Sequence, residues 1–252
     1  MTISLVAFDL DDTLAHSKSA IVPEMADALL ELLSVRPVCI ISGGRFEQFE
    51  TQVLSHLPSD DRLLQLHLMP TCGTQYLRWQ QEHWVQIYSH ELSQEDRDQC
   101  FTVLEAEARR LGFWDDEQEV YGDRLEDRRS QVTYSALGQA APVELKKRWD
   151  PDGSKREQLR SAVAPLLPDL EVRSGGSTSI DITQQGIDKA YGIGALAAQE
   201  GLDPHDILFV GDRLEPGGND YPVLALGVQS HAVRDSEDTP AYVRELVARL
   251  PR

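Results

Sequence analysis

The stretch Ile3-Ser4-Leu5-Val6-Ala7-Phe8-Asp9-Leu10-Asp11-Asp12-Thr13 decides the fold expected for this chain. Its first part is a short, nearly continuous apolar run, which is typical of a central parallel strand that is buried on both faces. The run ends abruptly at acidic residues, so the carboxyl end of the strand carries Asp9 and Asp11. Because Asp-rich turns are also common as helix caps and solvated turns, the pattern needs support from the rest of the chain.

The segments on either side of the chain's middle alternate strands and helices. After the first strand, Pro23 opens a helical pattern, and the sequence then predicts a strand over 35–41, a helix over 45–54 and a strand over 66–69. Near the C-terminus it predicts a helix over 189–200, strands over 207–210 and 229–233, and a helix from Pro240. This alternation predicts an α/β fold with a doubly wound, Rossmann-like parallel-sheet core.

The middle of the chain has antiparallel character instead. The sequence predicts a hairpin over 76–79 and 84–88, a charged helix over 93–111, a strand over 129–137, a helix over 155–167, and strands over 170–172 and 179–182. We therefore expect residues 81–185 to form an inserted α/β cap domain. Residues 1–80 and 186–252 would then form the catalytic core.

Composition limits the classes of function. The 252 residues include 42 acidic and 24 basic ones, and the formal net charge of −18 disfavours nucleic acid as a partner. We expect no membrane insertion, because no long apolar run occurs. Three widely spaced cysteines are expected to be reduced, and the first residues lack the features of a signal peptide, so the expected location is cytoplasmic.

A second acidic segment follows the strand predicted over 207–210. It contains Asp212 directly after Gly211, and then Gly218-Asn219-Asp220. Because strands of a doubly wound sheet present their carboxyl ends at one edge, we expect Asp9 to meet Asp212, Asn219 and Asp220 there. Oxygen ligands of this kind suit Mg²⁺ better than zinc, and each loop has too few carboxylates for calcium. A plain turn is the alternative for residues 217–220.

Two further segments can bind phosphate. Ser42-Gly43 ends the second predicted strand, where a hydroxyl and backbone amides at a helix start can hold phosphate oxygens. Lys189 opens a late helix, and its ammonium can neutralise phosphate charge. The alternatives are an ordinary N-cap for Ser42 and a solvated lysine for Lys189.

The order of these segments resembles the haloacid dehalogenase superfamily over the whole chain. The resemblance implies that Asp9 is the nucleophile and is phosphorylated, and that Asp11 acts as general acid and base. It implies that Mg²⁺ is held by Asp9, the backbone carbonyl of Asp11 and Asp212, with Asn219 or Asp220 in support. Lys189, Ser42 and Gly43 would bind the transferred phosphate, and Lys18 is a further phosphate-binding candidate.

The spacer between Gly211-Asp212 and Asn219-Asp220, together with Gly186-Ile187-Asp188-Lys189, is most similar to the eukaryotic-type phosphomannomutases. These belong to the subgroup of that superfamily with a large α/β cap. Arg128 falls where a cap arginine of that family binds phosphate, while Ser179 and Asp181 match its sugar contacts. Lys18, Gln139 and Lys146 stand where the mutases carry arginines, and Gln139 loses both the charge and the forked donor. Ser42-Gly43-Gly44-Arg45 is nearer the phosphatase pattern.

The resemblance implies phosphoryl transfer on a small sugar phosphate, and it leaves the acceptor open. A phosphomannomutase would use a hexose bisphosphate as activator, whereas a sugar-phosphate phosphatase would use water. Two other classes are a receiver-like phosphoacceptor domain and a catalytically inactive binding module. The oligomeric state is open as well, with a homodimer as one alternative.

Overall fold

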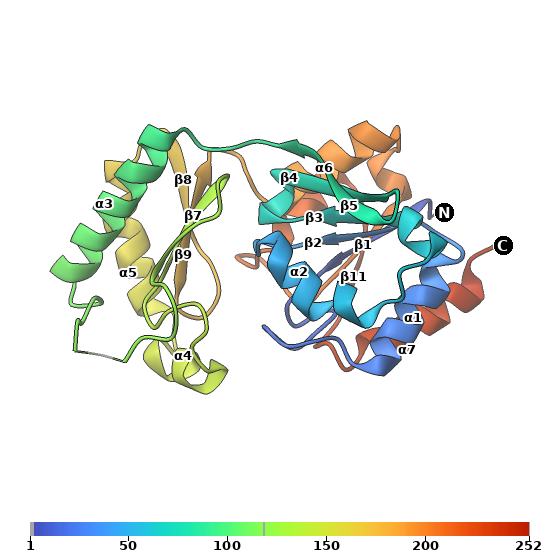
Figure 1. The fold of residues 1–252 in the computed structure, drawn as a ribbon, viewed down its shortest axis with the longest axis horizontal. Helices are drawn as coiled ribbons and strands as arrows, with labels where there is room; N and C mark the ends of the chain where they lie inside the picture. The colour runs from blue at the N-terminus through green and yellow to red at the C-terminus, as the bar shows by residue number, and fades with distance from the viewer. Residues whose placement is uncertain (1–2, 118, 252) are drawn as a thin grey trace. The chain divides into compact units, whose positions relative to one another are not determined.

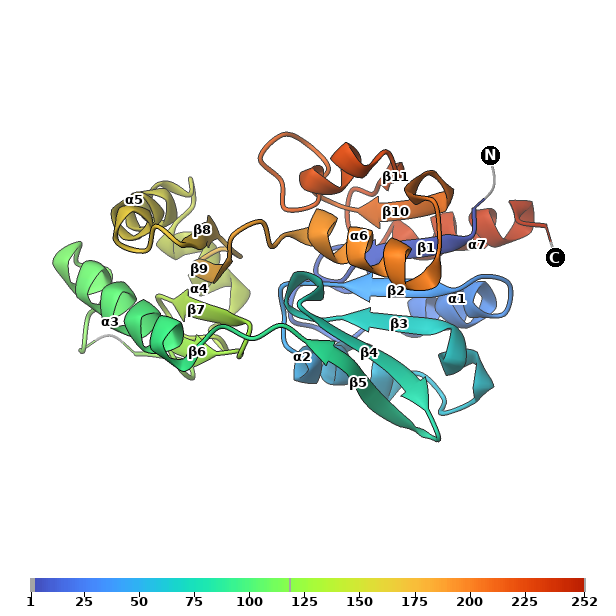
Figure 2. The same ribbon diagram turned by 90° about the horizontal axis from the view of Figure 1, so that it is seen from above.

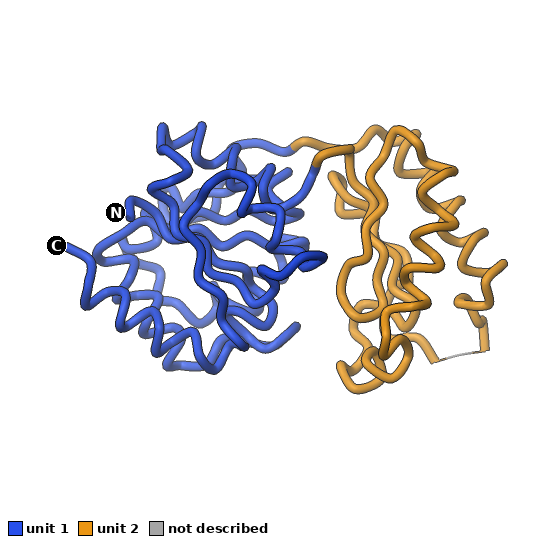
Figure 3. Tube along the Cα trace, turned by 180° about the vertical axis from the view of Figure 1, so that it is seen from behind, with its two compact units in different colours: residues 1–89, 187–252 blue, residues 90–186 orange. Residues whose placement is uncertain are grey.

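The computed structural model describes residues 3–117 and 119–251. It divides into two compact units, one made of Met1–Ser89 with Ile187–Arg252 and the other of His90–Gly186 (Figure 3). The first boundary falls after Ser89 and not at residue 81, because both strands of the hairpin that was expected to straddle the boundary belong to the sheet of the first unit. The alternating sequence pattern reveals a hairpin but does not show which sheet its strands join, so the boundary predicted from it came too early in the chain.

The first unit is built on a seven-stranded sheet in the order β11-β10-β1-β2-β3-β4-β5 (Figures 1 and 2). Its parallel strands are β1 (Leu5–Asp9), β2 (Val38–Ile41), β3 (Leu66–Met69), β10 (Ile207–Gly211) and β11 (Gln229–Ala232). The antiparallel hairpin of β4 (Gln75–Gln80) and β5 (His83–Ser89) extends the sheet beside β3. The predicted doubly wound α/β core is thereby confirmed.

Helices cover both faces of this sheet, which is why its central strands are apolar throughout. On one face, Val6 and Phe8 of β1 pack with α1 (Pro23–Leu33), α2 (Phe46–Gln52) and α7 (Thr239–Arg249). On the other face, Leu5 and Ala7 pack with α6 (Lys189–Glu200). Successive residues of β1 thus enter different cores, as the side-chain period of a strand requires.

The register of the central strands brings their carboxyl ends to one level. Asp9 at the end of β1 pairs with Ile41 at the end of β2, and Phe8 pairs with Val210 of β10. The residues that follow β1, β2 and β10 therefore lie at the same edge of the sheet.

The second unit has a four-stranded antiparallel sheet in the order β6-β7-β9-β8. Its strands are β6 (Leu125–Asp127), β7 (Gln131–Ser135), β8 (Leu170–Ser174) and β9 (Ser179–Gln184), and its helices are α3 (Gln94–Arg110), α4 (Val143–Trp149) and α5 (Ser154–Val163). Apolar residues on one face of the sheet, such as Tyr134 and Ile182, pack against α3 and α5. Thr133 and Asp181, which neighbour them along the strands, point to the opposite, polar face.

None of the helices in the described part of the chain combines the length and the apolar character needed to cross a lipid bilayer.

Candidate active site

Asp9 is the last residue of β1 and is 3% exposed. Its Oδ1 accepts a hydrogen bond of 2.7 Å from the backbone N–H of Leu10 and lies 2.5 Å from the Nζ of Lys189. The carboxylate is therefore fixed at the strand end by two donors.

Three carboxylates from distant parts of the chain meet at this edge. An oxygen from each of Asp9, Asp212 and Asp220 lies within 4.8 Å of the others. Asp212 directly follows β10, and Asp220 is brought back by a loop in which its Oδ2 accepts a hydrogen bond of 3.1 Å from the N–H of Arg213. Gly211 leaves room for this return, because a Cβ at that position would collide with the Asp220 carboxylate.

Lys189 places an ammonium group between two of these carboxylates, those of Asp9 and Asp220. It is the first residue of α6, whose start is capped by Asp188 through a bond of 2.9 Å from the N–H of Tyr191. Its Nζ lies 2.5 Å from Asp9 and 2.6 Å from Asp220, and the side chain is buried. Burial acts to lower the pKa of Lys189, but the two carboxylates outweigh it and raise that pKa above its ordinary value.

The charge of the cluster fits a divalent cation. Among the described residues, three carboxylates meet one ammonium, so two negative charges remain uncompensated. Burial, together with repulsion from neighbouring carboxylates, raises the pKa of Asp9 and of Asp212 despite the opposing effect of Lys189. Carboxylate oxygens at this spacing are the ligands that Mg²⁺ prefers, and its charge would balance the cluster.

Two of the expected metal ligands, Asn219 and Asp11, are not among the three clustered carboxylates. Asn219 is exposed, whereas the neighbouring Asp220 is fully buried. The side chain of Asp11 is not part of the acidic cluster. The prediction for Asp11 concerned its backbone carbonyl and not this side chain. Those two assignments stay predictions.

The Asp11 carboxylate is held by the loop and by α2. Its Oδ1 accepts from the N–H of Lys18 at 2.9 Å and from Nε2 of Gln52 at 3.4 Å. Its Oδ2 accepts from Nε2 of Gln48 at 2.9 Å and lies 3.3 Å from Nζ of Lys18. Burial acts to raise the pKa of Asp11, but Lys18 and these hydrogen bonds outweigh it and lower that pKa, so the resting group is a carboxylate.

Gln48 and Gln52 are site residues that the sequence prediction missed. They lie four residues apart on α2, so their side chains share one face of that helix. Their spacing directly after the Ser42 segment was the available signal, but two glutamines on a helix more often form a solvated face.

Ser42 follows β2 beside Asp9, because Ile41 and Asp9 are in register. Ser42 is buried, and its Oγ accepts from the N–H of Gly44 at 3.1 Å, which forms the tight turn that precedes α2. Gly43 lies in this turn, where an added Cβ would have only the Sγ of Cys72 within 4 Å, at 3.9 Å. The turn can present a hydroxyl and backbone amides to an anion.

The expected substrate residues of the second unit are engaged with one another and with their neighbours. Arg128 is 8% exposed and makes bonds of 2.6 and 2.9 Å to one oxygen of Glu126. Nζ of Lys146 donates to the carbonyl of Gln139 at 2.8 Å.

Ser179 and Asp181 share the polar face of β9. Asp181 accepts a bond of 2.7 Å from the hydroxyl of Thr133, its partner in the β7–β9 pairing. Neither residue's contact with a sugar is tested by this geometry.

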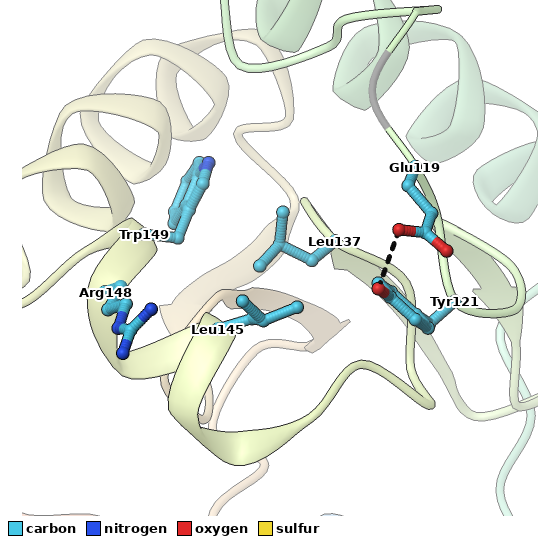
Figure 4. A pocket seen from close by; sticks show the side chains of 6 residues that line it. All are labelled: Glu119, Tyr121, Leu137, Leu145, Arg148 and Trp149. Atoms are coloured by element: carbon cyan, nitrogen blue, oxygen red, sulfur yellow. Dashed lines mark hydrogen bonds between the residues drawn. The ribbon is translucent and has the colours of Figure 1, made fainter.

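A separate cavity of about 330 Å³ lies within the second unit (Figure 4). It is lined by Glu119, Tyr121, Leu137, Leu145, Arg148 and Trp149. The Tyr121 hydroxyl donates to Glu119 at 2.9 Å at its rim. The apolar Leu137, Leu145 and Trp149 share its walls with three residues that carry polar groups, and none of the residues predicted to bind phosphate or metal lines it.

A doubly wound sheet with clustered carboxylates and a buried lysine at its carboxyl edge defines an enzyme of the phosphoryl-transfer class. The chain belongs to the haloacid dehalogenase-like hydrolases, since the model of that family matches residues 6–240. The protein is accordingly an enzyme of the haloacid dehalogenase phosphotransferase and phosphatase type.

Two phosphomannomutases match this chain over nearly its full length. A probable phosphomannomutase of Caenorhabditis elegans is 26% identical, with 98% of this chain and 96% of that protein covered. Human phosphomannomutase 1 is also 26% identical, with 96% and 91% covered.

Solved structures share the fold at lower identity. The IMP-bound IMP-nucleotidase of Plasmodium falciparum superposes with a TM-score of 0.70 at 12% identity, over 99% of this chain and 69% of that one. A haloacid dehalogenase-like hydrolase of Bacteroides thetaiotaomicron gives 0.66 at 15% identity, over 97% and 100%.

Proposed function

We propose that this enzyme transfers a phosphoryl group of a hexose phosphate through an aspartyl-phosphate at Asp9, in the manner of the phosphomannomutases that it resembles. The observation that carries the proposal is the position of the Asp9 carboxylate, at a strand end, in contact with Lys189 and beside Asp212 and Asp220. We expect this chemistry to take place in the cytoplasm.

In the first step, an oxygen of Asp9 attacks phosphorus while the bond from phosphorus to the sugar oxygen breaks. Asp11, after taking up a proton from solvent, gives it to that leaving oxygen and becomes a carboxylate. Lys189 keeps a positive charge against Asp9 and the transferring oxygens, and Ser42 with the Gly43 amide holds those oxygens. A Mg²⁺ ion held by Asp9, Asp212 and Asp220 would neutralise the phosphate and polarise its oxygens.

In the second step, the acceptor hydroxyl loses its proton to Asp11 and its oxygen attacks the aspartyl-phosphate. The bond from phosphorus to Asp9 breaks and the carboxylate is restored. The low pKa of Asp11 supports this half of the reaction, because an acceptor must meet Asp11 in its carboxylate form.

The acceptor separates two candidate activities. Full-length similarity to phosphomannomutases supports transfer back to a sugar, with a hexose bisphosphate as activator. The pairing of Arg128 with Glu126 supports a phosphatase instead, because a guanidinium already bound to a carboxylate is a weaker site for a second phosphate.

The test replaces Asp9 by Asn and supplies mannose and glucose phosphates with Mg²⁺, with and without a hexose bisphosphate. Phosphorus NMR then distinguishes an isomerised ester from free phosphate. We expect no product from Asp9→Asn, because an amide oxygen is a poor nucleophile. Asp27→Asn, which changes an exposed carboxylate on α1, should retain full activity. Wild-type turnover by Asp9→Asn would refute the proposal.

A further inference from the structure

The Asp11 carboxylate, which is 26% exposed, is held by donors on both of its oxygens. Four donor contacts reach it, two on each oxygen, from the backbone and side chain of Lys18 and from the two glutamines of α2. With both oxygens held, the carboxylate has little freedom to rotate. Its orientation is therefore set by α2 and by the loop that follows β1.

Gln48 connects Asp11 with Lys18. Its Nε2 donates to Asp11 and its Oε1 accepts from Nζ of Lys18 at 2.6 Å. The side chain folds back over the turn before α2, and Gly44 makes this possible, because a Cβ there would collide with the Gln48 amide. The Gln48 amide thus uses both its donor and its acceptor on charged groups.

Gln52 holds the same loop through further hydrogen bonds. It is 2% exposed, and its Nε2 donates to the carbonyl of Ser19 at 2.7 Å as well as to Asp11. The backbone carbonyl of Gln52 accepts from the N–H of Ile21 at 2.8 Å. The end of the loop is therefore fastened to the helix that carries Gln48.

We propose that Gln48 and Gln52 are positioning residues, which hold the Asp11 carboxylate in the orientation from which it passes a proton to and from the reacting oxygens. The inference rests on the proposed role of Asp11. It follows from the geometry of proton transfer, which requires the acid within hydrogen-bond reach and correctly aimed. Amide donors achieve this without adding a further charge to the site.

The test compares two esters that differ in how much they need a proton on the leaving oxygen. The 4-nitrophenolate ion is a weak base and leaves without one, whereas phenolate is a stronger base and gains from an acid. Gln48→Met keeps the length of the side chain but removes both hydrogen bonds. We expect its kcat/KM to fall about 10-fold or more with phenyl phosphate, and clearly less with 4-nitrophenyl phosphate, at little changed KM.

Two controls separate positioning from a structural effect. Glu50→Gln, an exposed change on the same helix, should leave both rates at the wild-type value. In an Asp11→Asn background, Gln48→Met should cost nothing further, because the group that it positions is gone. Gln52→Met should show the same dependence on the ester and gives a second variant of the same arrangement.

An equal fall on both esters, an unchanged rate, or an undiminished effect in the Asp11→Asn background would overturn the inference. These results remain distinct from a failure of the proposed function. That failure would show as turnover by Asp9→Asn, whereas an inactive Asp9→Asn with a fully active Gln48→Met would remove only the role of the glutamines.

Discussion

His67 is a buried histidine whose surroundings decide its charge. It lies on β3, is 2% exposed, and stacks on the ring of Tyr76, whose hydroxyl is 2.8 Å from Nδ1. Nη1 of Arg78 approaches the same nitrogen to 3.2 Å. Burial, with repulsion from Arg78, lowers the pKa of His67 to about 3, so the ring is neutral at neutral pH.

This shift predicts an acid-sensitive contribution to stability. The folded-state pKa lies below the unfolded value of about 6.5, so the contribution is complete above pH 6.5 and is lost as pH falls towards 3. Between pH 7 and pH 4 the free energy of unfolding should fall by up to about 3 kcal/mol more in the wild type than in His67→Gln. Urea unfolding at several pH values measures this, with His56→Gln, an exposed histidine, as control. Parallel pH curves for His67→Gln and the wild type would contradict it.

At the scale of single residues, the sequence predicted the site residues whose meeting depends only on the order and direction of the strands. Asp9 ends β1, and Asp212 and Asp220 lie in the loop after the neighbouring parallel strand β10, so the three meet at one edge of the sheet. Both strands are apolar runs that the sequence reveals. Gln48 could not be found that way, since its contact with Asp11 depends on the rotation of α2 and on the space above Gly44. The pairing of Arg128 with Glu126 likewise needs side-chain coordinates.

At the scale of elements, α6 carries Lys189 and is seated by a contact between two glycines. Gly192 of α6 packs on Gly73, and a Cβ on Gly192 would lie 2.5 Å from Cδ1 of Ile41 and 2.7 Å from the carbonyl oxygen of Cys72. Two of the three groups it would meet are backbone, which cannot move aside cheaply. The helix is therefore held against the carboxyl ends of β2 and β3, one turn from Lys189.

Gly192→Ala should push α6 outward and lower the free energy of unfolding by about 1–3 kcal/mol. Phosphoryl transfer should fall as well, because Lys189 moves with the helix. The matched control is Gly194→Ala in the same helix, where the added Cβ has its nearest neighbour, in Leu226, at 3.9 Å. That change should stabilise by roughly 0.5–1 kcal/mol through helix propensity. Equal effects of the two substitutions in urea unfolding would rule the contact out as the cause.

Helices and strands with a clear apolar pattern were predictable from the sequence, and those without one were not. β3 spans Leu66–Met69 as predicted, because an apolar run bounded by turn residues leaves little choice. β6 and α4 went unrecognised, since β6 has three residues and α4 has no fully buried side chain, so neither carries a periodic apolar pattern. Their existence depends on partners elsewhere in the second unit.

At the scale of the whole molecule, charge repulsion acts on both units, whereas the proposed cation acts on one. The net charge of −18 opposes the compact state, so sodium chloride should raise the unfolding temperature generally by screening. The acidic cluster lies entirely in the unit of Met1–Ser89 and Ile187–Arg252. A cation bound there stabilises that unit alone, by mass action.

Saturating Mg²⁺ should therefore raise the unfolding midpoint of the first unit by roughly 5–10 °C beyond sodium chloride at equal ionic strength. Calorimetry is the suitable measurement, because it resolves two transitions if the units unfold separately. Asp212→Asn should abolish the extra rise and keep the effect of sodium chloride, since it removes one ligand and only one of many surface and site charges. An extra rise of the same size in Asp212→Asn would mean that Mg²⁺ acts through the general acidic surface, and the three carboxylates around Lys189 would then not be its site.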